Sequence, residues 1–164
     1  MKRFEDKVVI VTGAASGLGE ATAERLSQEG AKLVLVDLNK DALDTLADKL
    51  GGDVLVVKAN VAELDDVKAY VAKTIEKFGR IDGFFNNAGI EGKQNLTEDF
   101  GADEFHKVVS INLDGVFFGM AEVLKVMREQ GSGAIVNTAS VGGIRGVGNQ
   151  SGYAASKHGV VGLT

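Results

Sequence analysis

Five short runs of aliphatic and β-branched residues alternate along the chain with longer amphipathic stretches. This alternation is typical of parallel strands connected by helices. Each run is too apolar for a sheet with one face in water, so helices are expected on both faces. The sequence therefore predicts an α/β fold, a doubly wound parallel sheet, in a single domain over residues 1–164. The expected strands are 7–12, 32–37, 53–58, 81–85 and 133–138, and the expected helices are 17–29, 41–50, 63–78, 103–109, 113–130 and one beginning near Tyr153.

Charge and composition exclude several classes of partner. The chain has 18 basic and 23 acidic residues, a net charge of −5, which argues against nucleic acid or an anionic membrane surface as the main partner. It has no cysteine, and His106 and His158 are too few and too far apart for a metal site, so no metal is expected. The charged start "MKRFEDK" leads into "VVIV", which is too short for a signal peptide or a membrane span. We expect a cytoplasmic protein.

The helix expected at 113–130 carries more apolar residues than one buried face requires. Either this helix is buried on two sides within the monomer, or it forms a subunit interface, and the sequence leaves both readings open. The expected core stripe is Leu113, Val116, Phe117, Met120, Leu124 and Met127, and the residues that widen it are Phe118, Ala121, Val123 and Val126.

The first expected strand ends in a glycine-rich turn, "TGAASGLGE" at 12–20. Glycines at such a junction let the backbone approach a pyrophosphate, whose charge is stabilised by the amino terminus of the following helix. The spacing differs from the commoner G-x-G-x-x-G form, and a Glu after the last glycine rules out a P-loop. The turn predicts a dinucleotide site, although three glycines alone are also compatible with a purely structural turn. Its candidate residues are Gly13, Ser16, Gly17, Leu18 and Gly19.

Asp37 closes the second expected strand and supports the dinucleotide reading. Its carboxylate is expected beside the glycine turn, where it would accept hydrogen bonds from both hydroxyls of an adenosine ribose. A carboxylate there repels a 2′-phosphate, and Ser16 supplies no positive charge, so NAD is favoured over NADP. Lys40 is the one nearby residue that favours the opposite choice. The alternative role for Asp37 is a helix cap or a turn residue.

Polar residues also follow the third and fourth expected strands. Asn60 is expected either to hydrogen-bond the adenine edge or to turn the chain. Val61, the next residue, is also expected to contact the cofactor. In "NNAG" at 86–89, we expect Asn86 to be structural. The remaining three residues, Asn87, Ala88 and Gly89, are expected near the cofactor.

Tyr153 and Lys157 are four residues apart in "SGYAASKHG" (151–159), so on a helix they share one face. A free tyrosine is a poor acid–base catalyst at neutral pH, and a neighbouring ammonium favours the phenolate. Hydride exchange between an alcohol and NAD needs such a group, because the oxygen gains or loses a proton. Ser140 is expected to donate to the same oxygen, and Asn112 to hold a water behind the lysine. The ordinary alternatives are a packing pair, a loop serine and a helix cap.

The motifs Thr12-Gly13-x-x-x-Gly17-x-Gly19, Asn86-Asn87-Ala88-Gly89, Asn112, Ser140 and Tyr153-x-x-x-Lys157 resemble, in order and interval, those of the short-chain dehydrogenase/reductase family. The resemblance covers the whole chain and implies a Rossmann-like fold. It also implies roles for the catalytic candidates: Tyr153 as acid–base, Lys157 binding the nicotinamide ribose and stabilising the phenolate, Ser140 orienting substrate, and Asn112 supporting a proton-relay water.

Within that family, segments 80–95 and 137–164 resemble reductases of a substituted cyclohexanedione, which implies a cyclic ketone or secondary alcohol as substrate. Ser140, Val141, Gln150 and Tyr153 are the expected substrate contacts. Family members are longer, so we expect this chain to lack the carboxyl-terminal part of the family fold, and the full-length form to be a dimer or tetramer. A nicotinamide-binding module without catalysis is the alternative function.

Overall fold

The computed structural model describes residues 2–164 as a five-stranded parallel sheet with strand order β3-β2-β1-β4-β5. Strands β1 and β4 are neighbours although β2 and β3 lie between them in the chain, so the direction of winding reverses between β1 and β4. The predicted doubly wound fold is confirmed. The strands are β1 (Val8–Thr12), β2 (Lys32–Asp37), β3 (Val54–Lys58), β4 (Gly83–Asn86) and β5 (Ala134–Asn137).

All six expected helices are present, with ends that differ from the predicted ones by one or two residues. Three short helical turns were not predicted: the 3₁₀ turns η1 (Thr97–Asp99) and η3 (Val141–Gly143), and a π-helical turn η2 (Ser110–Asp114) that leads into the fifth helix. The helices are α1 (Gly17–Gln28), α2 (Lys40–Leu50), α3 (Leu64–Phe78), α4 (Ala102–Val109), α5 (Gly115–Gln130) and α6 (Ser151–Leu163).

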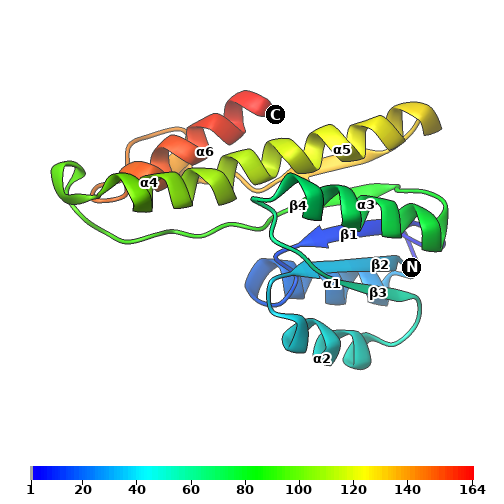
Figure 1. Ribbon diagram of the computed structural model, residues 1–164. Helices are drawn as coiled ribbons and strands as arrows, with labels where there is room; N and C mark the ends of the chain where they lie inside the picture. The colour runs from blue at the N-terminus through cyan, green and yellow to red at the C-terminus, as the bar shows by residue number, and fades with distance from the viewer. Residues whose placement is uncertain (1) are drawn as a thin grey trace.

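Alternate residues of each strand face two separate cores, as the period of a strand requires. Ile10 and Val34 pack with Tyr70 of α3 and Val123 of α5 on one face. The other face packs against α1 and α2, where Leu43 is fully buried. Figure 1 shows the resulting layers, with α3 and α5 on one side of the strands and α1 and α2 on the other.

The core stripe predicted for α5 is wrong in part. Phe117 and Leu124 are 52% and 47% exposed, whereas Val123 is fully buried. Phe117 and Leu124 directly follow the buried residues Val116 and Val123, which places them about 100° further around the helix, so the face that packs on the sheet is narrower than the predicted stripe. Gly119 also contributes to the buried face: a Cβ on this residue would lie 2.8 Å from the Phe84 ring, so a glycine there lets α5 approach the sheet.

Glu29, at the end of α1, fixes the amino-terminal segment to the fold. It is only 5% exposed and accepts hydrogen bonds from Arg3 Nη2 (2.7 Å) and from Arg25 Nε (2.6 Å), and Arg3 Nε donates to its other oxygen. The hydrogen bonds from Arg3 and Arg25 lower the pKa of Glu29 to about 2, against the opposing effect of burial.

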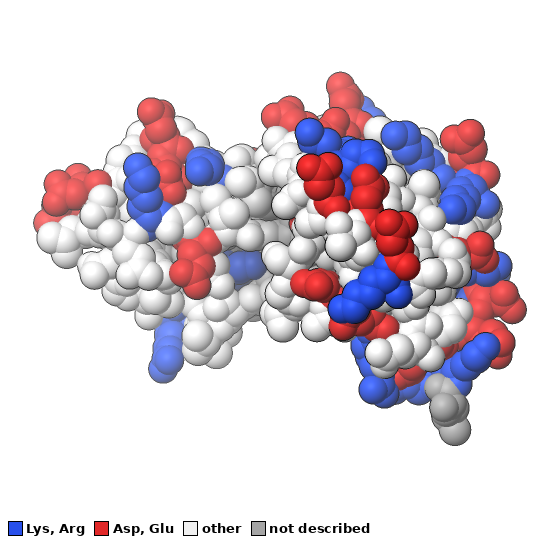
Figure 2. All heavy atoms as spheres, turned by 90° about the horizontal axis from the view of Figure 1, so that it is seen from below, with Lys and Arg blue, Asp and Glu red and all other residues white. Residues whose placement is uncertain are grey.

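None of the helices in residues 2–164 has the length and apolar character needed to cross a bilayer. Figure 2 views the molecule from below and shows acidic and basic side chains interspersed on that face.

Candidate active site

A cleft of about 470 Å³ lies at the carboxyl ends of the strands and includes the residues that follow β1 and β4. In doubly wound folds, this reversal point is where ligands bind. Twelve of the predicted site residues line the cleft: Gly13, Ser16, Gly17, Leu18, Asp37, Asn60, Val61, Asn87, Ala88, Gly89, Tyr153 and Lys157. Six residues that the sequence analysis did not single out complete the lining: Leu38, Ala59, Ile90, Glu91, Ile111 and Thr138.

The glycine turn places the amino terminus of α1 at this cleft. Gly13 and Gly17 have φ angles of +65° and +57°, which favour glycine. Gly19 does not line the cleft: it is buried, and a Cβ there would lie 2.0 Å from the Gly13 carbonyl oxygen, so its role is close packing of the turn. The Ser16 side chain makes no capping hydrogen bond. The first amide groups of α1 therefore have no side-chain cap from Ser16 and suit an anionic ligand.

The structure confirms one of the two roles predicted for Asp37, that of a turn residue, while ribose binding stays a prediction. Its Oδ2 accepts a hydrogen bond from the Ala15 amide and its Oδ1 from the Asn39 amide, each at 3.1 Å, so the side chain holds the glycine turn. The same carboxylate lines the cleft, and each oxygen has a second lone pair for a ligand hydroxyl. Asn60 likewise lines the cleft while its Oδ1 accepts from the Ala62 amide (3.1 Å), which turns the chain.

Asn86, the last residue of β4, and Asn87 after it are tied to neighbouring elements by hydrogen bonds. Asn86 is buried and donates to the Val116 carbonyl (2.9 Å) and to Asn137 Oδ1 (3.1 Å). Asn87 donates its amide to Thr12 Oγ1 (2.9 Å), and its Oδ1 accepts from Thr138 Oγ1 (3.0 Å). Asn87 therefore shapes the cleft floor as well as lining it.

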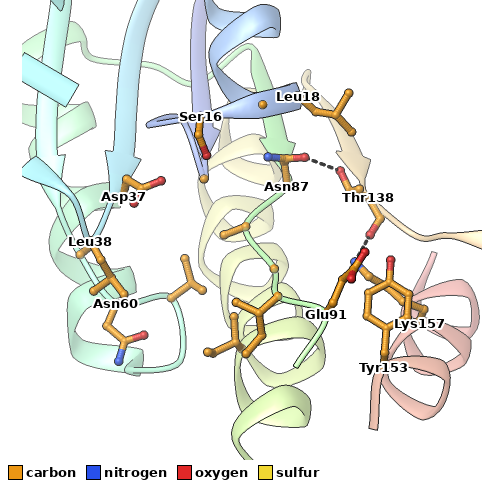
Figure 3. A pocket seen from close by; sticks show the side chains of 18 residues that line it. Ser16, Leu18, Asp37, Leu38, Asn60, Asn87, Glu91, Thr138, Tyr153 and Lys157 are labelled. Atoms are coloured by element: carbon orange, nitrogen blue, oxygen red, sulfur yellow. Dashed lines mark hydrogen bonds between the residues drawn. The ribbon is translucent and has the colours of Figure 1, made fainter. Parts of the chain in front are cut away.

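Tyr153 and Lys157 lie together on α6 and face the cleft from the side opposite Asp37 (Figure 3). Lys157 Nζ lies 5.8 Å from the centroid of the Tyr153 ring. It donates to the Thr138 carbonyl oxygen at 2.6 Å, and the residue is 4% exposed. Burial lowers the pKa of Lys157. A negative charge on the Tyr153 oxygen would be stabilised by this poorly hydrated cation.

Asn112 is fully buried within η2 and does not line the cleft. Its Oδ1 accepts from the Ile90 amide (2.8 Å), and its Nδ2 donates to the Ile90 carbonyl (2.8 Å) and to Ser156 Oγ (3.1 Å). Both amide hydrogens are therefore used within the protein, whereas Oδ1 has one remaining lone pair.

The remaining predicted residues, Ser140, Val141 and Gln150, do not line the cleft. Ser140 is the N-cap of η3, and its Oγ accepts from the Gly142 amide at 3.1 Å. A Cβ on Gly142 would lie 3.2 Å from the Tyr153 ring, so the serine turn packs beside the tyrosine. Val141 is 53% exposed and Gln150 is buried.

The arrangement fits a dinucleotide. Helix-terminal amides, a carboxylate and a tyrosine–lysine pair occur along one cleft, in the places where a pyrophosphate, a ribose and a nicotinamide end would be bound. Thr138 was missed, and Thr12 was named in the family motif without a role, because their contributions are hydrogen bonds to distant segments. Glu91 had no sequence signal beyond its position two residues after "NNAG".

Comparison with known proteins supports this assignment. The family model of the short chain dehydrogenases matches residues 7–164. The chain is 65% identical to levodione reductase of Leifsonia aquatica over 99% of its own length and 62% of that protein. It is 44% identical to cyclohexanol dehydrogenase of Acinetobacter sp. (strain SE19), covering 99% of this chain and 66% of that protein. The chain therefore spans less than two thirds of the length of these relatives.

Two solved structures of dehydrogenases and reductases also match this chain closely. The crystal structure of levodione reductase has a TM-score of 0.97 and 64% identity, and the match covers 99% of this chain and 65% of that one. The structure of NAD⁺-bound xylitol dehydrogenase has a TM-score of 0.96 and 37% identity, and the match covers 99% of this chain and 64% of that one.

Proposed function

The chain belongs to the short chain dehydrogenase family, and on that premise we propose that the full-length protein is an oxidoreductase that interconverts a secondary alcohol and a ketone with NAD(H). One observation carries the proposal. Tyr153 and Lys157 line the same cleft as the glycine turn and Asp37, although they come from opposite ends of the chain. A binding module needs the turn and the carboxylate and would use Lys157 to contact the nicotinamide ribose, but only proton transfer needs the Tyr153 hydroxyl beside that lysine.

The residues at the β1–β2 end of the cleft would hold the adenosine part of the cofactor. The first amides of α1 would bind the pyrophosphate, and Asp37 would accept from the ribose hydroxyls. The same carboxylate would repel a 2′-phosphate. Lys40, which favoured the opposite choice, is paired with Asp44 at 2.6 Å, which weakens its attraction for a phosphate. We therefore propose NAD as the preferred cofactor over NADP.

The bound cofactor would supply the hydride chemistry, so that the alcohol carbon would lose a hydride to NAD and the ketone carbon would gain one from NADH. Tyr153 would take the proton from the alcohol oxygen, or give it to the ketone oxygen. Lys157 would stabilise the charge that develops on Tyr153 and contact the nicotinamide ribose. The Ser140 oxygen accepts from the Gly142 amide, so its own hydrogen stays available to donate to the substrate oxygen.

Asn112 would support a proton-relay water beside Lys157. The geometry around Gly89 supports this role, because a Cβ there would lie 3.1 Å from Asn112 Oδ1 and 3.6 Å from Lys157 Nζ. The absent side chain leaves room near both polar atoms. A water at that place would bond the free lone pair of Oδ1, and the proton of Tyr153 would leave toward solvent by that route.

The substrate is proposed to be a cyclic ketone or the corresponding secondary alcohol, because the most similar relatives reported above are named for cyclic compounds. Val141 and Gln150 are proposed as substrate contacts together with Ser140 and Tyr153. The homo-oligomeric state and the cytoplasmic location stay predictions of the sequence.

The test uses the full-length protein with NADH, NADPH and a panel of ring ketones. We expect oxidation of NADH by at least one ring ketone, loss of that activity in Tyr153→Phe, and a weaker NADH affinity in Asp37→Ala. Activity that survives Tyr153→Phe unchanged would refute the catalytic assignment. NADH binding without turnover of any ketone or alcohol would favour the binding module.

A further inference from the structure

Glu91 is a charged residue of the cleft to which the proposed function assigns no role. Its side chain is exposed and lies at the end of the cleft where Thr138, Tyr153 and Lys157 are labelled in Figure 3. It forms no ion pair with any residue in 2–164. An unpaired carboxylate at this place contributes directly to the electrostatic potential that a substrate encounters.

The backbone on both sides of Glu91 is anchored. The Ile90 amide and carbonyl both bond the Asn112 side chain at 2.8 Å. Gly92 has a φ of +76° and packs so closely on α4 that a Cβ there would lie 2.4 Å from Val108 Cγ2. The next amide, that of Lys93, donates to Glu104 Oε1 at 2.9 Å. Residue 91 is therefore held at the cleft wall by contacts that precede and follow it.

Three side chains with formal charge line the cleft: Asp37, Glu91 and Lys157. Asp37 lies at the adenosine end, where it bonds the glycine turn. Lys157 is buried and its Nζ is bonded to a carbonyl, whereas Glu91 is exposed. We call the end of the cleft that holds Tyr153 and Lys157 the catalytic end. Without Glu91, the positive charge of Lys157 would be uncompensated there and would attract oxo acids and other anions.

We propose that Glu91 is a specificity-determining residue that restricts the substrate to uncharged ketones and alcohols by repelling anionic groups at the catalytic end of the cleft. This inference rests on the proposed function, because it defines the substrate class of the same site. Repulsion between the Glu91 carboxylate and an anionic ligand group several ångströms away, in a partly solvated cleft, would weaken binding of that ligand by about fivefold to tenfold.

Two isosteric probes separate charge from shape: cyclohexanecarboxamide, which is neutral, and cyclohexanecarboxylate, which is anionic. Each is titrated calorimetrically into the NADH complex of the full-length protein and of Glu91→Gln. We expect the substitution to tighten binding of the carboxylate by about fivefold to tenfold and to change binding of the carboxamide by less than about twofold. Glu98→Gln is the matched control, because it removes the same charge from η1, outside the cleft lining, and is expected to leave both affinities unchanged.

The steady-state form of the experiment compares cyclohexanone with 4-oxocyclohexanecarboxylate, and the ratio of their kcat/KM values should shift in the same direction in Glu91→Gln. Glu91→Ala provides a second variant if the glutamine form folds poorly. An unchanged preference between the two probes, or no binding of either probe to any of the proteins, would overturn the inference. If the binding preference shifts but no ketone is reduced, the proposed enzyme function fails, and what stands is that Glu91 keeps anionic ligands out of the cleft.

Discussion

Thr12 is predicted to stabilise the segment of Asn87 and Ala88, which lines the cleft. The residue is fully buried at the end of β1, and its Oγ1 accepts hydrogen bonds from the amides of Asn87 (2.9 Å) and Ala88 (3.1 Å). Thr12→Val keeps the shape of the side chain and removes this acceptor. The two amides lie 75 and 76 residues away in the chain, so no local group is positioned to replace the lost oxygen.

The magnitude follows from the two donors. A buried donor left without a partner costs about 1–3 kcal/mol, and the lower part of that range applies because Asn87 and Ala88 are only half-buried. Thr12→Val should therefore lower the free energy of unfolding by about 2–3 kcal/mol. Thr12→Ser keeps the acceptor and loses one buried methyl group, which costs about 1 kcal/mol.

The assay is urea denaturation of the full-length protein, followed by circular dichroism, together with titration of NADH by fluorescence. We expect Thr12→Val to be less stable than Thr12→Ser and to bind NADH more weakly, because the segment of Asn87 and Ala88 lines the cleft. A valine variant as stable as the serine variant would refute the reasoning, since it would show that the two hydrogen bonds contribute nothing beyond packing.

Four further outcomes are expected. Because the pKa of Glu29 is lowered to about 2 in the folded protein, its stabilising contribution is complete above its unfolded pKa and is lost as pH falls toward 2. When the free energy of unfolding is measured between these pH values, it should depend less on pH in Glu29→Gln than in the wild type. Burial lowers the pKa of Lys157, so the charged side chain opposes folding at pH values below that pKa. The free energy of unfolding of the wild type relative to Lys157→Met should therefore rise as pH increases toward the ordinary lysine pKa of about 10.4. A difference between the two proteins that does not change with pH would contradict this. Gly17→Ala meets no atom within 4 Å but is strained by its φ of +57°, so urea denaturation should give a loss of about 1–2 kcal/mol. Gly19→Ala would place a Cβ 2.0 Å from the Gly13 oxygen, so the same measurement should show a larger loss, together with weaker NADH binding.

Local pattern was sufficient for the elements and for most of the cleft lining. A parallel strand covered by helices is apolar on both faces, so the five apolar runs predicted the strands from local sequence alone. The expected cover on both faces is incomplete at β5, where Val136 is 59% exposed. The glycine turn and Asp37 were predicted for a similar reason, because each directly ends a strand and parallel strands end at one edge.

The face of α5 shows where the pattern was insufficient. Apolar spacing counted from Leu113 treats the segment as one regular helix, but Ser110–Asp114 form a π turn. Val116 and Met127 of the same stripe also follow this turn and are buried, so the exposure of Phe117 and Leu124 shows instead that α5 packs on the sheet with a narrower face than the apolar stripe. A π turn forms where tertiary contacts hold it, here around the three hydrogen bonds of Asn112, and it has no periodic signature in the sequence.

The sequence by itself determined the order of strands and helices along the chain and which residue types stand at the strand ends. Only the tertiary structure decided which of these residues contact one another across the fold. Lys157 bonds the carbonyl of Thr138, and the side chain of Asn112 holds Ile90 and so the position of Glu91. These contacts join residues 19 and 22 positions apart, beyond the reach of any helical or strand period. They follow from how the strands are ordered in the sheet and how the helices pack on it.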